Sequence, residues 1–151
     1  MKNQKTLTNK GFSLVELIIV VAIMAILIGV LAPQYLRYVE KTRLQKDNSA
    51  ISEVANVIKM ASADEGIIGE LNTSSATVTF SSTGMTVSGS LLSAEVYKTI
   101  ASDSVKITSS TYGSSAPQLT VEVDSATSIV TVTATGWFDA PGTAHTGNMT
   151  F

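Results

Sequence analysis

The chain has 151 residues, a length that suits one modest domain with an attached segment rather than two full domains. Its 10 basic and 12 acidic residues nearly balance, but from Asn48 onward three basic residues stand against nine acidic ones, which disfavours nucleic-acid binding. Cysteine is absent, which excludes disulfides and thiolate metal sites, and the Ser/Thr-rich sequence after residue 72 is typical of β-rich extracellular domains.

The N-terminal region combines a short basic segment with a long apolar one. Residues 1–11 are polar and carry Lys2, Lys5 and Lys10, the only charges before residue 16. Residues 12–32 are almost wholly apolar, and a helix of this length would span about 31 Å, close to the hydrocarbon core of a bilayer. A buried globular helix would show a polar face, and a secretory signal peptide would have a shorter apolar run before an A-x-A-like site. We therefore expect a membrane-spanning helix.

The charges on the two sides of this span do not decide its orientation. Three lysines precede the span, and it is followed by Arg37, Lys41, Arg43 and Lys46. The positive-inside rule therefore favours neither direction.

One ionisable residue, Glu16, interrupts the apolar run about 6 Å along the helix from Phe12. An ionised carboxylate at that depth costs on the order of a few kcal/mol unless it finds a partner. The side chain could instead reach the headgroups or be protonated, because a solitary span offers it no basic partner. An intramembrane carboxylate close to a helix start is nonetheless a candidate functional residue.

Residues 10–17 read Lys-Gly-Phe-Ser-Leu-Val-Glu-Leu and lead directly into the apolar run. Over about residues 5–55 the chain resembles type IV pilins and type II secretion pseudopilins, whose prepilin signature has this form. The resemblance implies that a prepilin peptidase cuts between Gly11 and Phe12 on the cytoplasmic side and methylates the new N-terminus, making N-methylphenylalanine. It also implies that the leader is cytoplasmic and that the C-terminal domain lies outside.

The resemblance marks Phe12, Glu16 and Pro33 as the expected assembly residues. It implies that the methylated amine of Phe12, which stays cationic, pairs with Glu16 of another copy and guides each subunit into register. Gly11, without a Cβ, lets the backbone approach a protease closely, although it could equally be an ordinary loop glycine. Pro33 is expected to kink or loosen the helix around residues 29–35, or simply to end the membrane helix at the interface.

Beyond the span, residues 34–65 are predicted to continue as an amphipathic helix that stops at Gly66. A helix from Phe12 to about Ala63 would be about 78 Å long. Such a length does not fit a single small globule, so the first half must be buried in membrane or among copies of the chain.

This second half of the helix has one apolar stripe and several charged pairs. Glu40 with Arg43, and Arg43 with Asp47, have the spacing of weak surface ion pairs. The stripe consists of Ile51, Val54, Ala55, Ile58, Ala61 and Ser62.

Residues 66–151 are predicted to form a small antiparallel sheet laid on this stripe. Residues 136–151 are expected to be a loop-rich tail with Trp137 or Phe138 in the core. The other predicted segments are a hairpin over 76–80 and 85–88, a short helix over 91–101, a strand over 105–107, and a second hairpin over 118–124 and 128–135.

No catalytic constellation is visible in the sequence. His145 is the only histidine, so a His-based triad would need Ser and Asp from distant segments. Asp103 and Asp139 could bind calcium with loop carbonyls, but they lack EF-hand spacing, and solvated loop carboxylates are the simpler interpretation. No phosphate-cradling G-x-x-x-x-G-K-[ST] loop occurs. We therefore predict no enzyme activity, no cofactor and no metal site.

The predicted fold class is α+β, a pilin fold whose long N-terminal helix, transmembrane in its first half, packs on a small antiparallel sheet. The expected organisation is a removed cytoplasmic leader (1–11), a transmembrane and assembly helix (12–33), an amphipathic helix (34–65) and a Ser/Thr-rich sheet domain (66–151). The absence of cysteine departs from many Gram-negative pilins, which close a C-terminal loop with a disulfide.

The predicted function is a structural subunit of a type IV pilus or pilus-like surface filament, assembled by helix packing after processing. The alternatives are a pseudopilin of a type II secretion or DNA-uptake system and a minor tip pilin with an adhesin role. Expected partners are further copies of the chain, the prepilin peptidase and N-methyltransferase, an inner-membrane assembly platform and, before assembly, the membrane. The expected location is first the cytoplasmic membrane, crossed once, and then the cell surface.

Overall fold

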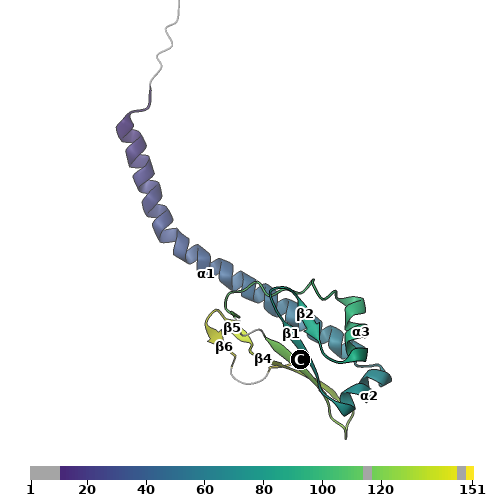
Figure 1. Ribbon diagram of the computed structural model, residues 1–151. Coiled ribbons are helices and arrows are strands. Elements are labelled where there is room, and N and C mark those ends of the chain that lie inside the picture. Colours follow the sequence, from purple (N-terminus) through teal and green to yellow (C-terminus); the bar gives the residue numbers. More distant parts are fainter. Residues whose placement is uncertain (1–10, 114–116, 146–148) are drawn as a thin grey trace, which may run out of the picture. The chain divides into compact units, whose positions relative to one another are not determined.

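The computed structural model describes residues 11–113, 117–145 and 149–151, so most of the predicted leader lies outside the described residues. The described part of the chain forms two compact units, which divide between Arg37 and Tyr38. Its helices are α1 (Leu14–Ala61), α2 (Glu65–Thr73) and α3 (Ser90–Thr99) (Figure 1). Its strands are β1 (Ala76–Phe80), β2 (Met85–Val87), β3 (Gln118–Val123), β4 (Val130–Thr135), β5 (Phe138–Ala140), β6 (Thr143–Ala144) and β7 (Met149–Thr150).

The first unit contains the N-terminal part of α1, which is one helix of 48 residues. The helix continues through Pro33, so the alternative that Pro33 ends the membrane helix is wrong, and the loosening expected of residues 29–35 in a filament stays a prediction. Proline removes only one backbone donor, and the hydrogen bonds of the turns on either side are sufficient to keep the helix together. A role for Pro33 in assembly stays a prediction.

The second unit is a five-stranded antiparallel sheet packed on the C-terminal part of α1 (Figure 1). The strand order is β2-β1-β3-β4-β7, and both predicted hairpins are present. Alternate residues of β1 and β3 face the core, as the period of two in these strands requires. The predicted α+β fold with its helix-on-sheet core is confirmed, and that core includes Ile51, Val54, Ile58, Val78, Phe80, Leu119, Val121 and Val132.

Helix α1 ends at Ala61, earlier than predicted, and a second short helix follows it. Asp64 is the N-cap of α2, and its Oδ1 accepts a hydrogen bond of 2.8 Å from the Gly66 N–H. The expectation that residues 64–66 stop the long helix was therefore wrong, because Asp64 begins a new helix by satisfying a free amide at its start.

One further expectation about the second unit needs correction. Residues 105–107 form no strand; the Ile107 N–H donates to Ser81 O, and the segment then turns toward α1. The tail, expected to be loop-rich, also contains short strands, because β7 is the fifth strand of the sheet and β5 pairs with β6. Within the tail Trp137 is buried and Phe138 is half-buried.

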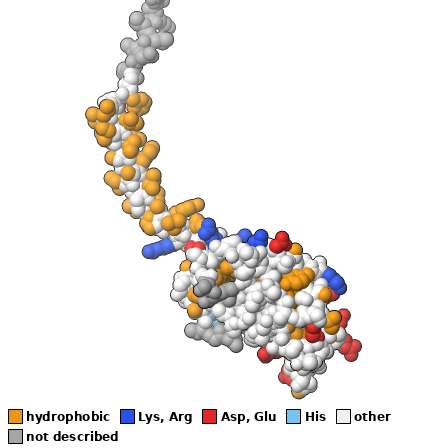
Figure 2. Space-filling model, viewed as in Figure 1, with side chains coloured by type: hydrophobic (Ala, Val, Ile, Leu, Met, Phe, Trp, Pro, Cys, Tyr) orange, Lys and Arg blue, Asp and Glu red, His pale blue; other side chains and the backbone are white. Residues whose placement is uncertain are grey.

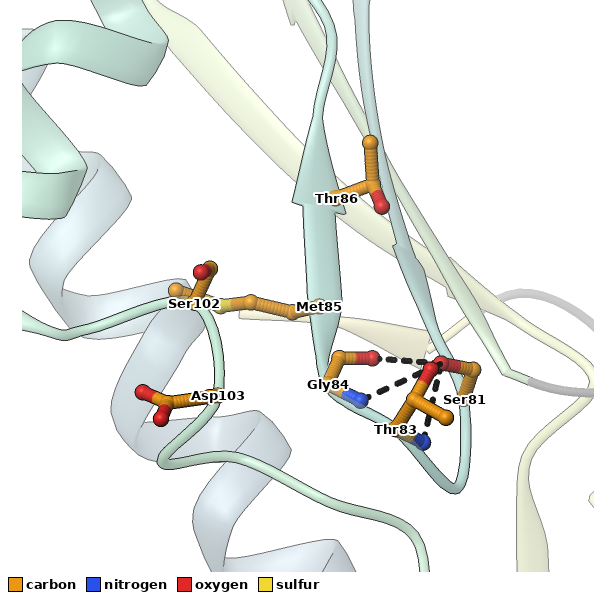
Figure 3. A pocket seen from close by; sticks show the side chains of 7 residues that line it. All are labelled: Ser81, Thr83, Gly84, Met85, Thr86, Ser102 and Asp103. Atoms are coloured by element: carbon orange, nitrogen blue, oxygen red, sulfur yellow. Dashed lines mark hydrogen bonds between the residues drawn. The ribbon is translucent and has the colours of Figure 1, made fainter.

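The turn between β1 and β2 is held by the hydroxyl of Ser81 (Figure 3). Ser81 Oγ donates to Gly84 O at 2.8 Å and accepts from the N–H groups of Thr83 and Gly84. A Cβ at residue 84 would stand 2.4 Å from the carbonyl oxygen of Ser102, so only glycine fits this close approach.

Candidate processing and assembly site

The predicted cleavage position lies just before α1 and is open to solvent. The Phe12 side chain is 88% exposed. Among the described residues, no atom lies within 4 Å of a Cβ built at Gly11, so their packing does not require glycine there. Packing among the described residues therefore does not explain the glycine, and its role in cleavage stays a prediction.

Glu16 has a local partner in the free chain. Its Oε2 accepts a hydrogen bond of 2.9 Å from the N–H of Ser13, the residue before α1 begins. This is one half of a capping box, in which a glutamate at the third helical position bonds back to the cap residue. The Ser-x-x-Glu spacing signals this bond in the sequence, but the role predicted for Glu16 from the sequence did not include it.

The apolar part of α1 is uncovered throughout the first unit. Every residue from 11 to 37 is exposed, and this helix is long and apolar enough to cross a membrane (Figure 2). A continuous apolar surface of this size marks a membrane or protein contact, because water contact with it is unfavourable. This surface of the helix is therefore expected to be covered by a membrane or by protein when the chain functions.

A match to a protein-family model covers part of this same segment. Residues 7–32 match the family model described as the prokaryotic N-terminal methylation motif. The N-terminal segment carries a type IV pilin signature. Two curated relatives, each named fimbrial protein and each from Pseudomonas aeruginosa, are 43% identical to the chain over 69 residues.

The likeness to these fimbrial proteins is confined to part of each chain. The aligned region is 46% of this chain and 42% of each relative, so the chain spans less than half the length of the curated relatives it matches. No solved structure gives a significant match. The pilin resemblance found in the sequence is confirmed, and it rests on the N-terminal motif.

In the second unit, two carboxylates of α1 bind one loop of the sheet domain. Asp47, which is 1% exposed, accepts from the Thr108 N–H, the Thr108 hydroxyl and the Ser109 N–H at 2.7–3.0 Å. Glu40 Oε1 accepts from the Ser109 hydroxyl and from the N–H and hydroxyl of Thr111 at 2.6–3.0 Å. We call this arrangement the loop clamp.

The loop clamp overturns the surface ion pairs expected between these carboxylates and Arg43. Both carboxylates turn toward the loop, and Arg43 is exposed with no ion pair among the described residues. The physical reason is that Asp47 is buried, where the backbone N–H groups of the loop need acceptors. A neighbouring Asn48 extends the same attachment, because its amide accepts from the Tyr112 hydroxyl and donates to Phe138 O.

The hydrogen bonds of the loop clamp also set the acidity of Glu40. Partial burial raises the pKa of Glu40, but the bonds from Ser109 and Thr111 outweigh it and lower the pKa from 4.5 to about 2. The folded state therefore holds this carboxylate ionised well into the acid range.

Glu40→Gln should destabilise the protein at neutral pH but not at pH 2. The folded pKa lies below the unfolded one, so the stabilisation is complete above about pH 4.5 and is lost as the pH falls to about 2. Partial solvation limits the difference to about 1–2 kcal/mol. Urea unfolding of the full chain at both pH values measures it, with Glu53→Gln at an exposed position as the matched control. An equal loss at pH 2 and pH 7 would contradict the assignment.

The other candidate site residues are not gathered into a site. His145 Nδ1 lies 3.0 Å from Asp139 Oδ2, and no serine hydroxyl is among its contacts in the described part of the chain. Asp103 lines a separate pocket of about 140 Å³ beside the β1–β2 turn, with its carboxylate pointing away from Ser81 (Figure 3). Among the residues that the structure describes, no three acidic or histidine side chains lie together as metal ligands would.

Proposed function

We propose that the chain is a structural subunit of a type IV pilus or a pilus-like surface filament. The observation that carries the proposal is the uncovered apolar helix of the first unit, which directly follows the methylation motif. As a precursor, the chain would cross the cytoplasmic membrane once through residues 12–33. After removal of residues 1–11, copies of the helix would cover one another in the filament, so the apolar surface stays out of water.

The start of α1 is suited to pairing between copies. Glu16 already lies next to the helix start, where it bonds to the Ser13 N–H through Oε2, while Oε1 makes no hydrogen bond within the described residues. A new amine at Phe12 would be a cation at the end of a helix in an apolar setting. Its pairing with Glu16 of a neighbouring copy would neutralise two charges that are both costly in low dielectric.

The β2 edge of the sheet offers little opportunity for assembly by strand addition. The outward N–H groups of β2, those of Met85 and Val87, donate to Ser102 O and to the Tyr97 hydroxyl. An edge strand whose donors are already used is a poor template for strand addition from another chain. This supports helix packing as the mode of polymerisation.

Analysis of filaments sheared from native cells tests the proposal. We expect electron microscopy to show filaments built from this chain, and mass spectrometry to find its N-terminal peptide beginning at methylated Phe12. Gly11→Leu should block cleavage without disturbing the fold, because no part of the chain that the structure describes packs against residue 11. A native chain that keeps residues 1–11 and stays an unpolymerised membrane protein would overturn the proposal. Trace amounts confined to filament tips would instead identify a minor tip subunit.

A further inference from the structure

The second unit carries exposed charges of opposite sign in two separate places. Three cations lie in the first turns of α1 within this unit, and we call Lys41, Arg43 and Lys46 the basic end. Red side chains gather near α2 and the β3–β4 hairpin in Figure 2. We call Asp64, Glu65, Glu122 and Asp124 the acidic end.

The cations of the basic end make no ion pair with a carboxylate within the described chain. The nearest carboxylates on the same helix, Glu40 and Asp47, are occupied by the loop clamp. Among the residues that the structure describes, the ion pair between a lysine or arginine and a carboxylate is Lys98 with Glu95, which lies elsewhere. The basic end therefore offers exposed cationic groups with which a partner's carboxylates can pair directly.

Two of the four carboxylates of the acidic end are available to a partner, while Asp64 and Asp124 accept hydrogen bonds from nearby backbone N–H groups. Glu65 and Glu122 are exposed and accept no hydrogen bond within the described residues. Glu122 lies beside residues 71–75, which brings it close to the end of α2. Glu95 raises the pKa of Lys98, and the nearby Asp64 raises it by a smaller amount. The Lys98 ammonium is already bonded to Glu95 at 2.5 Å.

The two ends cannot meet within one molecule. From Lys41 to Ala61 the helix rises about 30 Å, and the acidic end begins just beyond it. This distance exceeds the screening length of about 8 Å at physiological ionic strength, so the two ends do not neutralise each other. A second copy displaced along the helix direction would bring opposite charges together.

We propose that the basic end of one copy packs against the acidic end of the next copy along the filament. The inference rests on the proposed function, because polymerisation brings the copies together. A second copy suits both charged ends at once, whereas anionic lipid or nucleic acid would be attracted by the basic end and repelled by the acidic end. The contact sets the axial register of the second units, while the apolar helices supply most of the affinity.

Charge reversal with rescue tests the contact in cells. A triple reversal of the basic end should lower the yield of surface filaments about tenfold through like-charge repulsion. Its changes are Lys41→Glu, Arg43→Glu and Lys46→Glu. A double reversal of the acidic end, Glu65→Lys with Glu122→Lys, should lower the filament yield by a similar factor. A variant that carries all five changes should recover the wild-type filament yield. Lys41→Arg with Lys46→Arg keeps the charge and should behave as wild type. Normal yield from either reversed set, or no rescue in the combined one, would overturn the proposed contact.

Cross-linking gives a second test that does not depend on filament yield. The chain has no cysteine, so single cysteines can be placed at the exposed residues Gln45 and Asn72, near the two ends. Co-expressed Gln45→Cys and Asn72→Cys copies should form a mixed disulfide dimer in membranes or filaments. A Gln45→Cys copy with a Thr79→Cys copy, exposed on the sheet, is the matched control and should cross-link far less.

The outcomes separate the two proposals. Filaments that form without the mixed cross-link would overturn the end-to-end contact and leave the filament role intact. A native chain that shows neither filaments nor any cross-link would overturn both. The detergent-purified chain can also be tested for binding to phosphatidylglycerol vesicles. If the triple reversal abolishes this binding but leaves filaments normal, the basic end binds lipid and the proposed contact is wrong.

Discussion

Glu16→Ala should reduce surface filaments by at least about tenfold, because an unpaired amine left in an apolar interface costs several kcal/mol and each 1.4 kcal/mol is a factor of ten. The substitution also removes the hydrogen bond from the Ser13 N–H, which contributes about 1 kcal/mol to the helix start. The second effect is too small to prevent a helix of 48 residues from forming. Filament yield by electron microscopy and immunoblotting of sheared fractions measures the result.

Glu16→Gln separates the two roles of the carboxylate. Glutamine preserves the capping box, since its side-chain oxygen accepts from the same backbone N–H, but it removes the charge. If pairing with Phe12 of another copy is the important role, the glutamine variant should fail to assemble as the alanine variant does. Both variants should still insert into the membrane and be cleaved after Gly11. Normal filaments from Glu16→Gln would show that only helix capping matters.

Asp47→Ala should lower the free energy of unfolding by about 3–5 kcal/mol, the largest stability effect we expect in the second unit. The carboxylate is buried and accepts three hydrogen bonds from Thr108 and Ser109. Its removal leaves the buried Ser109 N–H without an acceptor and opens a small cavity under the loop. The total stability of a domain is only about 5–15 kcal/mol, so the variant should unfold at much lower urea concentrations.

Controls for Asp47→Ala lie on the same helix. Arg43→Ala removes a side chain that is exposed and should change the stability by less than about 0.5 kcal/mol. Asp47→Asn keeps the shape but places an amide donor among backbone donors, so an intermediate loss is expected. Urea titration of the full chain in detergent, followed by near-ultraviolet circular dichroism at Trp137, measures all three. A stability change for Asp47→Ala as small as that of Arg43→Ala would show that the loop clamp contributes little.

The loop clamp also keeps the basic end free. A carboxylate that is held by loop N–H groups is not available to Lys41, Arg43 or Lys46. The same hydrogen bonds that attach the sheet domain to α1 therefore leave positive charge for a neighbouring copy. Stability of one subunit and the proposed contact between subunits are in this way linked by the positions of Glu40 and Asp47.

The sequence by itself determined the long helix, its apolar first half, the methylation motif and the two hairpins. These features depend on local rules: the period of apolar residues, the length of the apolar run, the alternation of threonine and valine, and one short motif. Each can be read from neighbouring residues without knowledge of what they pack against. The stripe that includes Val54 and Ile58 was predictable for the same reason, and it does face the sheet.

Only the tertiary structure decided which partners the charged and tail residues take. Arg43 lies three and four residues from Glu40 and Asp47, so local spacing favoured ion pairs, but the acceptors are instead used by residues 108–111. Likewise β7 pairs with β4 although its two residues carry no pattern, because it completes an edge that distant residues create. Hydrogen bonds between segments 60 or 70 residues apart have no local signature, since either partner would look the same in another fold.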